Sequence, residues 1–157
     1  MSELKLSVDS KNEEEQVAQV MHTLLGRLPS GTATLEVKRN SSGLILYLKP
    51  ANENSAGFGI HYDGCVDVFF GKFGKTFELP YESGLPKDAD FEATLAWAKV
   101  VGLAVIAGNC KEYAGFLGIR GTVEIDGKPY GVTSFLHFRL FPKTFRYASY
   151  CAVSVSV

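Results

Sequence analysis

Two Asp-Gly pairs, Asp63-Gly64 and Asp126-Gly127, most constrain what this chain can fold into. Each pair stands between two runs in which apolar and polar residues alternate. The flanking runs are 57–62, 65–70, 115–125 and 128–140. Both residues of an Asp-Gly pair tolerate positive φ, which a two-residue hairpin turn requires. The pairs therefore predict antiparallel hairpins and favour an antiparallel sheet over a parallel nucleotide-binding fold.

Further strands are predicted on either side of these hairpins. Segments 32–39 and 44–50 alternate around a polar turn, and a short strand follows at 75–79. These strands complete an antiparallel meander of about five strands. In the second half, a turn at 141–144 leads from the run that follows Asp126-Gly127 into a final strand at 145–155. The second half is therefore expected to hold three long antiparallel strands.

An amphipathic helix is predicted near the N-terminus, because six apolar residues fall on one stripe at helical spacing. They are Val17, Val20, Met21, Leu24, Leu25 and Leu28. Ser10 with Glu13, or Asn12 with Glu15, offers a capping box at its start. Glutamates 13–15 would then lie in the first turn, where carboxylates suit the positive end of the helix dipole. The alternative interpretation of this acidic run is a docking motif.

A second, central helix is predicted from Asp88 or Asp90 to a left-handed stop at Gly108-Asn109. Lys99 is the only charged residue between positions 93 and 107, so this helix is expected to be buried on most of its circumference. The order of elements is helix, five strands, helix, three strands. That order predicts one α+β domain over residues 1–157, a length at which 46% hydrophobic residues suffice for a core.

Composition and motifs exclude several classes of function. Sixteen Lys and Arg against 17 Asp and Glu give a net charge of −1, which argues against a nucleic-acid partner. The longest apolar run, 100–107, is too short to cross a membrane, and the start of the chain lacks a secretory signal, so a cytoplasmic location is expected. Cys65, Cys110 and Cys151 have no metal-ligand or disulfide spacing and are expected to be free thiols. No cofactor motif is present in the sequence.

The first candidate site is a basic face on the predicted final hairpin. If 141–144 is a four-residue loop, Arg139 stands opposite Arg146, and Lys143 lies at the loop tip. Two opposed arginines repel unless an anion lies between them. The predicted partner- or anion-binding residues are His137, Arg139, Lys143, Arg146 and Tyr150. The alternative is a solvated sheet face whose arginines pair with acidic residues of a neighbouring strand.

The second candidate site surrounds the Asp63-Gly64 turn. A two-residue turn sets Ile60 opposite Asp67, so that Asp67 would lie among apolar side chains, where a carboxylate is a candidate functional group. His61 would then lie on the opposite face of the sheet. The two residues are therefore not expected to form a dyad, and a structural role competes with an acid or base role for each.

These features leave three classes of function. The leading class is a non-catalytic, cytoplasmic protein-binding module, such as an inhibitor, an immunity-type protein or an adaptor, that uses the basic and aromatic face. The second is a protein that binds a small apolar acid in a pocket between the sheet and the central helix. An enzyme with Asp67 or His137 as acid or base ranks third. A homodimer through the final strand or the central helix is a further expectation.

Overall fold

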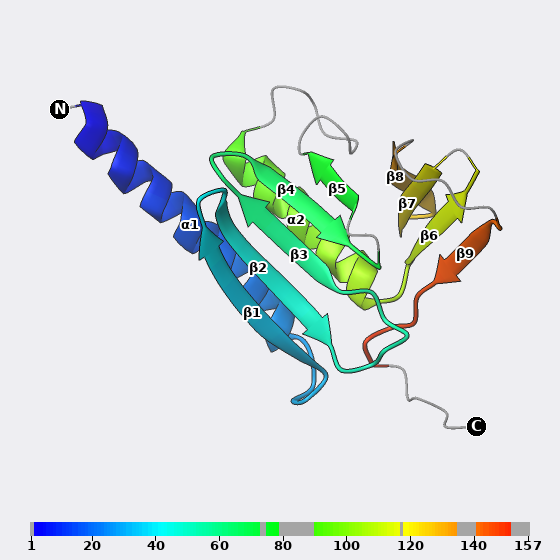
Figure 1. Cartoon of the computed structure of the whole chain (residues 1–157). Coiled ribbons are helices and arrows are strands. Elements are labelled where there is room, and N and C mark those ends of the chain that lie inside the picture. Colours follow the sequence, from blue (N-terminus) through cyan, green and yellow to red (C-terminus); the bar gives the residue numbers. More distant parts are fainter. Residues whose placement is uncertain (1, 73–74, 79–89, 117, 135–140, 152–157) are drawn as a thin grey trace.

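The computed structural model describes residues 2–72, 75–78, 90–116, 118–134 and 141–151. Over these residues the chain forms two helices and nine strands (Figure 1). The helices are α1 (Ser2–Gly26) and α2 (Phe91–Ile106). The strands are β1 (Ala33–Asn40), β2 (Gly43–Pro50), β3 (Phe58–Tyr62), β4 (Val66–Phe70), β5 (Lys75–Glu78), β6 (Cys110–Gly115), β7 (Gly118–Ile125), β8 (Lys128–Ser134) and β9 (Lys143–Arg146). The protein is therefore α+β, as the sequence predicts.

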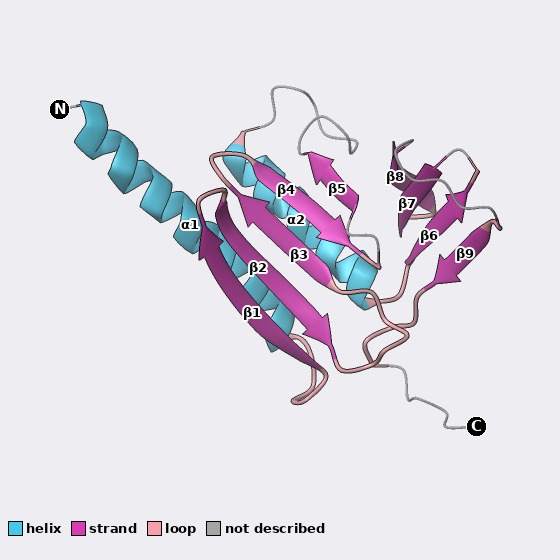
Figure 2. Ribbon diagram, in the orientation of Figure 1, coloured by secondary structure: helices cyan, strands magenta, loops and turns pink. Residues whose placement is uncertain are grey.

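Strands β1 to β5 form an antiparallel sheet, sheet A, in which neighbours in sequence are neighbours in space. The five-strand meander is thus confirmed. Both helices pack against one face of sheet A and against each other, and no helix among the described residues covers the opposite face, which we call the helix-free face (Figure 2). Alternate residues of β2, Leu44, Leu46 and Leu48, are buried beneath the helices. Tyr47 between them points to the helix-free face, where side chains are only partly covered.

The second sheet, sheet B, has four strands in the order β8-β7-β6-β9 and corrects two predictions. Strand β6 was not expected, because its buried Glu112 breaks the apolar alternation that identifies a half-buried strand. The expected hairpin between 128–140 and 145–155 is wrong, since β9 pairs with β6. A turn signal predicts where the chain reverses, whereas the free edge of β6 decides which strand the returning chain joins.

Helix α1 starts at Ser2, so the capping box predicted at Ser10 or Asn12 is wrong. The apolar stripe is confirmed, because Val17, Met21 and Leu24 are fully buried. The glutamates lie in the middle of the helix rather than in its first turn. Two of them anchor α1 to sheet A: Glu14 accepts two hydrogen bonds from Arg39 of β1, at 2.6 and 2.9 Å, and Glu13 accepts one from the hydroxyl of Tyr62 on β3.

Helix α2 begins where the sequence predicts. The N-cap Asp90 accepts a hydrogen bond from the backbone N–H of Ala93 at 2.8 Å, and Gly108 takes the left-handed conformation with φ of 82° just beyond the end. At Gly102 a Cβ would stand 2.6 Å from Leu24 and 2.9 Å from Phe58, so these two side chains fill the space between sheet A and the helices. Among the described residues, neither helix is long and apolar enough to span a membrane.

The two Asp-Gly turns differ. Asp126-Gly127 is the predicted two-residue turn, with both φ angles positive at 52° and 74° and with Ile125 paired to Lys128. At Asp63-Gly64 the loop has three residues, because Tyr62 pairs with Val66. The Asp63 carboxylate accepts the backbone N–H of Cys65, which keeps Cys65 out of the ladder. One extra loop residue shifts the register of β4 by one and exchanges its two faces.

Candidate functional site

The face of sheet B that points away from α2, the outer face, carries cations from neighbouring strands. Cys110, Glu112 and Ala114 of β6 are buried on the inner face, so Lys111 between them points outward. Lys111 is the register partner of Arg146 on β9. The two cations therefore oppose each other on adjacent strands, the arrangement that the sequence predicts for Arg139 and Arg146, with a different strand as the partner of β9.

Exposed aromatic rings accompany these cations. Tyr113 is 45% exposed and Phe116 is 58% exposed. They line a shallow depression of about 840 Å³ together with the two cations and Arg120, which is the register partner of Tyr113. Of the ion pairs formed between described residues, none includes Lys111 or Arg146. The outer face can thus offer guanidinium and ammonium donors beside flat apolar surface.

The five residues of the first predicted site do not lie together on one face of the structure. Lys143 and Arg146 both lie exposed on β9, and the Lys143 ammonium is 5.0 Å from the centre of the Phe145 ring. Tyr150 was expected on the basic face and is instead 3% exposed in the core, with its hydroxyl 3.4 Å from the Leu48 carbonyl oxygen. The strand ends at Arg146, so the alternation that placed Tyr150 does not extend to it. His137 and Arg139 lie outside the described residues.

Glu112 links sheet B to sheet A and was not identified from the sequence. Its side chain is fully buried, and its carboxylate accepts the backbone N–H of Lys72 at 2.5 Å and the hydroxyl of Tyr147. A Cβ at Gly71 would lie 2.0 Å from this carboxylate, so glycine is required for the approach. Burial, followed by the hydrogen bond to Glu112, raises the pKa of Tyr147 and keeps its hydroxyl protonated as a donor. The sequence gives no clear signal for this site, because the carboxylate at an inward position hides the apolar alternation of the strand that carries it.

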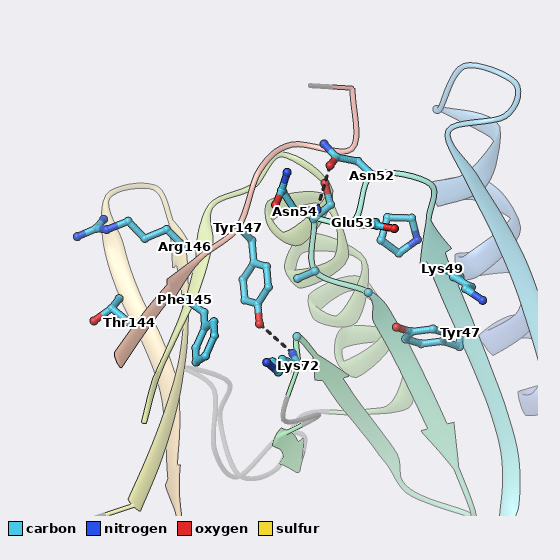
Figure 3. Close-up of a pocket in the computed structure, with 15 residues that line it drawn as sticks. Tyr47, Lys49, Asn52, Glu53, Asn54, Lys72, Thr144, Phe145, Arg146 and Tyr147 are labelled. Atoms are coloured by element: carbon cyan, nitrogen blue, oxygen red, sulfur yellow. Dashed lines mark hydrogen bonds between the residues drawn. The ribbon is translucent and has the colours of Figure 1, made fainter. Parts of the chain in front are cut away.

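A groove of about 700 Å³ runs between β9 and the helix-free side of sheet A (Figure 3). We call it the inter-sheet groove. Its walls are the segment 144–147 on one side and Tyr47, Lys49 and the loop 52–57 on the other. Lys72 lies between Tyr47 and Phe145 in Figure 3, with its backbone N–H held 2.9 Å from the Tyr147 hydroxyl. The hydrogen bond from the backbone N–H of Ala148 to the carbonyl oxygen of Asn54, at 2.8 Å, ties the two walls together.

His61 and Asp67, the second predicted site, do face each other, contrary to the expectation. They are register partners, with Nδ1 of His61 3.6 Å from Oδ2 of Asp67, and both are about one-fifth exposed on the helix-free face. The three-residue loop at 63–65 is the reason, because it moves Asp67 away from the apolar face. Nε2 of His61 donates to the carbonyl oxygen of Ser42 at 2.6 Å. The 3.6 Å separation between these two atoms exceeds hydrogen-bond length, and the two side chains form an ion pair only when His61 carries a proton on both ring nitrogens.

No group of three or more His, Cys, Asp or Glu side chains within the described part of the chain is arranged to hold a metal ion. The three cysteines are free, with Cys110 buried and Cys65 and Cys151 exposed. No known protein family, curated protein or solved structure matches this chain. The site therefore has to be interpreted from its own geometry.

Proposed function

We propose that this protein is a non-catalytic protein-binding module, of the kind that serves as an inhibitor, an immunity-type protein or an adaptor. In this proposal the partner contacts the outer face of sheet B. The observation that carries it is the arrangement of Lys111 opposite Arg146, with the exposed rings of Tyr113 and Phe116 beside them. Arg and Tyr are enriched among the residues that dominate binding energy at protein interfaces.

Two physical costs of the free protein favour an acidic partner. Like charges directly opposite each other on adjacent strands destabilise a sheet, and exposed aromatic rings leave apolar surface in water. A carboxylate placed between Lys111 and Arg146 would remove the first cost, and burial of Tyr113 and Phe116 would remove the second. The whole chain has a net charge of −1, so a basic face would steer association locally and in a salt-dependent way.

We also propose that the protein is cytoplasmic and that it forms a homodimer. Strand β9 is an edge of sheet B, which leaves one side of Lys143–Arg146 available for pairing with another chain. A strand of four residues offers few backbone groups, so a dimer through this edge would need further contacts. Static light scattering of the purified protein between 10 and 500 µM (roughly the range in which weak dimers form) measures the oligomeric state directly.

An affinity pull-down with charge-reversed baits tests the proposed interface. The baits are the wild type and the double variant Lys111→Glu/Arg146→Glu, each exposed to a nuclease-treated lysate of the producing cells. The matched control is Lys11→Glu/Lys128→Glu, which makes the same change in charge at exposed sites of α1 and β8. We expect a partner that binds the wild type and the control, and that binds the double variant at least tenfold more weakly when the affinity is measured with purified proteins.

Thermal melting of each bait first establishes that it is folded. Equal binding of one partner to all three baits would contradict the outer face as the interface. The absence of any saturable protein partner for the wild type would contradict the module itself.

A further inference from the structure

The helix-free side of sheet A carries two aromatic rings that lie side by side on its central strand. Tyr47 of β2 and Phe69 of β4 have ring centroids 6.1 Å apart and planes inclined by only 6°. Strand β3 runs between them, and Gly59 of this strand pairs with both residues, while Gly57 lies just before the strand. We call the two rings the aromatic shelf. It is separate from the outer face of sheet B.

The glycines leave room for the rings above the backbone of β3. A Cβ at Gly57 would stand 1.9 Å from the Tyr47 hydroxyl oxygen, and a Cβ at Gly59 would stand 2.1 Å from Cζ of Phe69. The far ends of both rings therefore occupy the space above the glycines, as aromatic residues often do across from a strand glycine. Both rings line a hollow of about 430 Å³ on the helix-free side of the sheet.

Two lysines and one glutamate are the described charged residues that line this hollow. Lys38 and Lys72 line it together with Ile45, and both lysines are exposed. Glu36 is the carboxylate in the lining, and it lies 3.8 Å from the ammonium of Lys49, which offsets its charge. The rim is therefore positive. His61 and Asp67 lie on the same face of the sheet and contact each other at 3.6 Å.

The position of Lys72 is fixed by sheet B. Its backbone N–H donates to the buried Glu112 and to the hydroxyl of Tyr147, and its ammonium lies 4.9 Å from the centre of the Phe145 ring. Lys72 thus lies between the Phe145 ring on one side and Tyr47 of the shelf on the other (Figure 3). A cation held in this way loses less side-chain entropy when it binds an anion.

We infer that the aromatic shelf is a binding site for a planar aromatic anion, such as an aryl carboxylate. The ligand ring stacks on Tyr47 and Phe69, and the anionic group meets the ammonium of Lys72. A hollow of about 430 Å³ lies within the roughly 300–1,000 Å³ typical of small-molecule sites. The two parallel rings favour a planar ligand ring, since offset stacking is the preferred aromatic geometry. Lys38 and Lys72 in the lining favour a ligand with a negative charge.

This site differs in place from the pocket between sheet and central helix that the sequence suggested for an apolar acid. Leu24 and Phe58 occupy that space beside Gly102. The shelf lies on the opposite face of the same sheet. The inference is also independent of the proposed protein-binding function, because its residues belong to sheet A and to the segment that follows β4, and the proposed interface belongs to sheet B.

Titration with 2-naphthoate, followed by isothermal calorimetry and by the NMR signals of the Phe69 ring, tests the site. The neutral analogue 2-naphthalenemethanol has the same ring system without the charge. We expect saturable binding of one 2-naphthoate, with upfield shifts of the Phe69 ring protons from the stacked ligand. The neutral analogue, the variant Lys72→Gln and the variant Phe69→Leu are each expected to bind at least fivefold more weakly, since one lost contact of this kind costs about 1 kcal/mol.

Matched controls away from the shelf are Lys128→Gln and Phe141→Leu, which make the same chemical changes at exposed sites. They are expected to bind 2-naphthoate as the wild type does. Three results would each overturn the inference: no saturable binding to the wild type, equal affinity for the neutral analogue, or equal weakening by the controls. If Phe69→Leu fails to fold, the affinity of Lys72→Gln and the NMR shifts of the Phe69 ring in the wild type still test whether 2-naphthoate binds at the shelf.

Discussion

Sheets A and B are both antiparallel, yet they are held in place by different interactions. Sheet A buries the inward side chains of β2, β3 and β4 beneath α1 and α2, and Phe58, Ile60 and Val68 are wholly inaccessible there. Sheet B packs its inner face on α2, where Trp97 meets Tyr130 of β8 edge to face at a centroid distance of 5.1 Å. Glu112 of sheet B also makes a polar link to sheet A, because its carboxylate accepts the backbone N–H of Lys72 just beyond the end of β4.

Because of this difference, stability and binding depend on different surfaces of the protein. The core of sheet A depends on apolar area and packing, which tolerate little change. The outer face of sheet B and the helix-free face of sheet A contribute little to that core, so charged and aromatic residues can be placed on them for contact with other molecules. The buried Glu112 fixes how the two faces sit relative to each other. The predictions that follow test this division, from the largest expected effect to the smallest.

Removal of the Phe58 ring should destabilise the whole molecule. Phe58→Ala leaves a cavity between sheet A and α2, and we expect the free energy of unfolding to fall by about 4 kcal/mol in urea denaturation. Phe116→Ala removes the same group from the exposed end of the β6–β7 hairpin and should change it by less than about 0.5 kcal/mol. Similar losses for both variants would contradict the assignment of the core to sheet A.

The Cys110 thiol should react far more slowly than an ordinary one. Burial, followed by the charge of Glu112, raises the pKa of Cys110 from its usual 9.0 to about 12. At pH 8 its thiolate fraction is then on the order of a thousandfold below that of an unperturbed thiol. Titration with a chromogenic disulfide should show two fast thiols, Cys65 and Cys151, and one slow thiol. Fast modification of Cys110, located by mass spectrometry, would mean that the start of β6, where Cys110 is buried, opens readily to solvent.

Loss of the Glu112 carboxylate should loosen sheet B selectively. Glu112→Ala leaves the backbone N–H of Lys72 and the hydroxyl of Tyr147 without this acceptor, and a buried donor without a partner costs about 1–3 kcal/mol. Trp97, the single tryptophan, contacts sheet B and reports its docking by fluorescence. We expect the fluorescence transition in urea to shift to lower concentration than the circular dichroism transition.

The matched control for this variant is Glu124→Ala, which removes an exposed carboxylate from the neighbouring strand β7. It should leave both transitions together and close to those of the wild type. Coincident transitions for Glu112→Ala, however far they move, would show that the two sheets unfold as one unit.

The smallest effect is expected at the pair Glu14–Arg39. The hydrogen bonds from Arg39 hold the pKa of the Glu14 carboxyl below its usual value, more than partial burial raises it. A group whose pKa is lowered in the folded state stabilises the protein above its unfolded pKa, and this contribution is lost as the pH falls through the folded value. Arg39→Gln should therefore lower the urea midpoint at pH 7 by less than about 0.5 M and leave it unchanged near pH 2. An equal shift at both pH values would contradict the ionic origin.

Local features of the fold followed from the sequence. The turn at Asp126-Gly127, the stripe that includes Val17 and Met21, and the cap at Asp90 all depend on residues within a few positions of each other. The backbone conformations that glycine and aspartate allow, and the periods of helix and strand, act over that range whatever the rest of the chain does. This is why most elements were predictable, with β6 as the strand that the sequence did not reveal.

The candidate sites depended on contacts between distant segments. One additional loop residue, Cys65, reversed the faces of β4 and brought Asp67 to His61. Strand β9 pairs with the edge of β6 and not with the strand that precedes it in sequence. Arg146 therefore lies opposite Lys111. Register and strand partner are set by which surfaces can be buried together and which edge is free, and neither property belongs to a single segment.

The sequence by itself determined both helices, the meander of sheet A and the turn at Asp126-Gly127, because dihedral preference and apolar periodicity are local. Only the tertiary structure decided that Glu112 is buried as the link between the sheets, that Tyr47 and Phe69 lie on the glycines of β3, and that Tyr150 belongs to the core. Each of these positions requires space or hydrogen-bond partners supplied by residues tens of positions away. Such partners exist only once the two sheets have packed around α2.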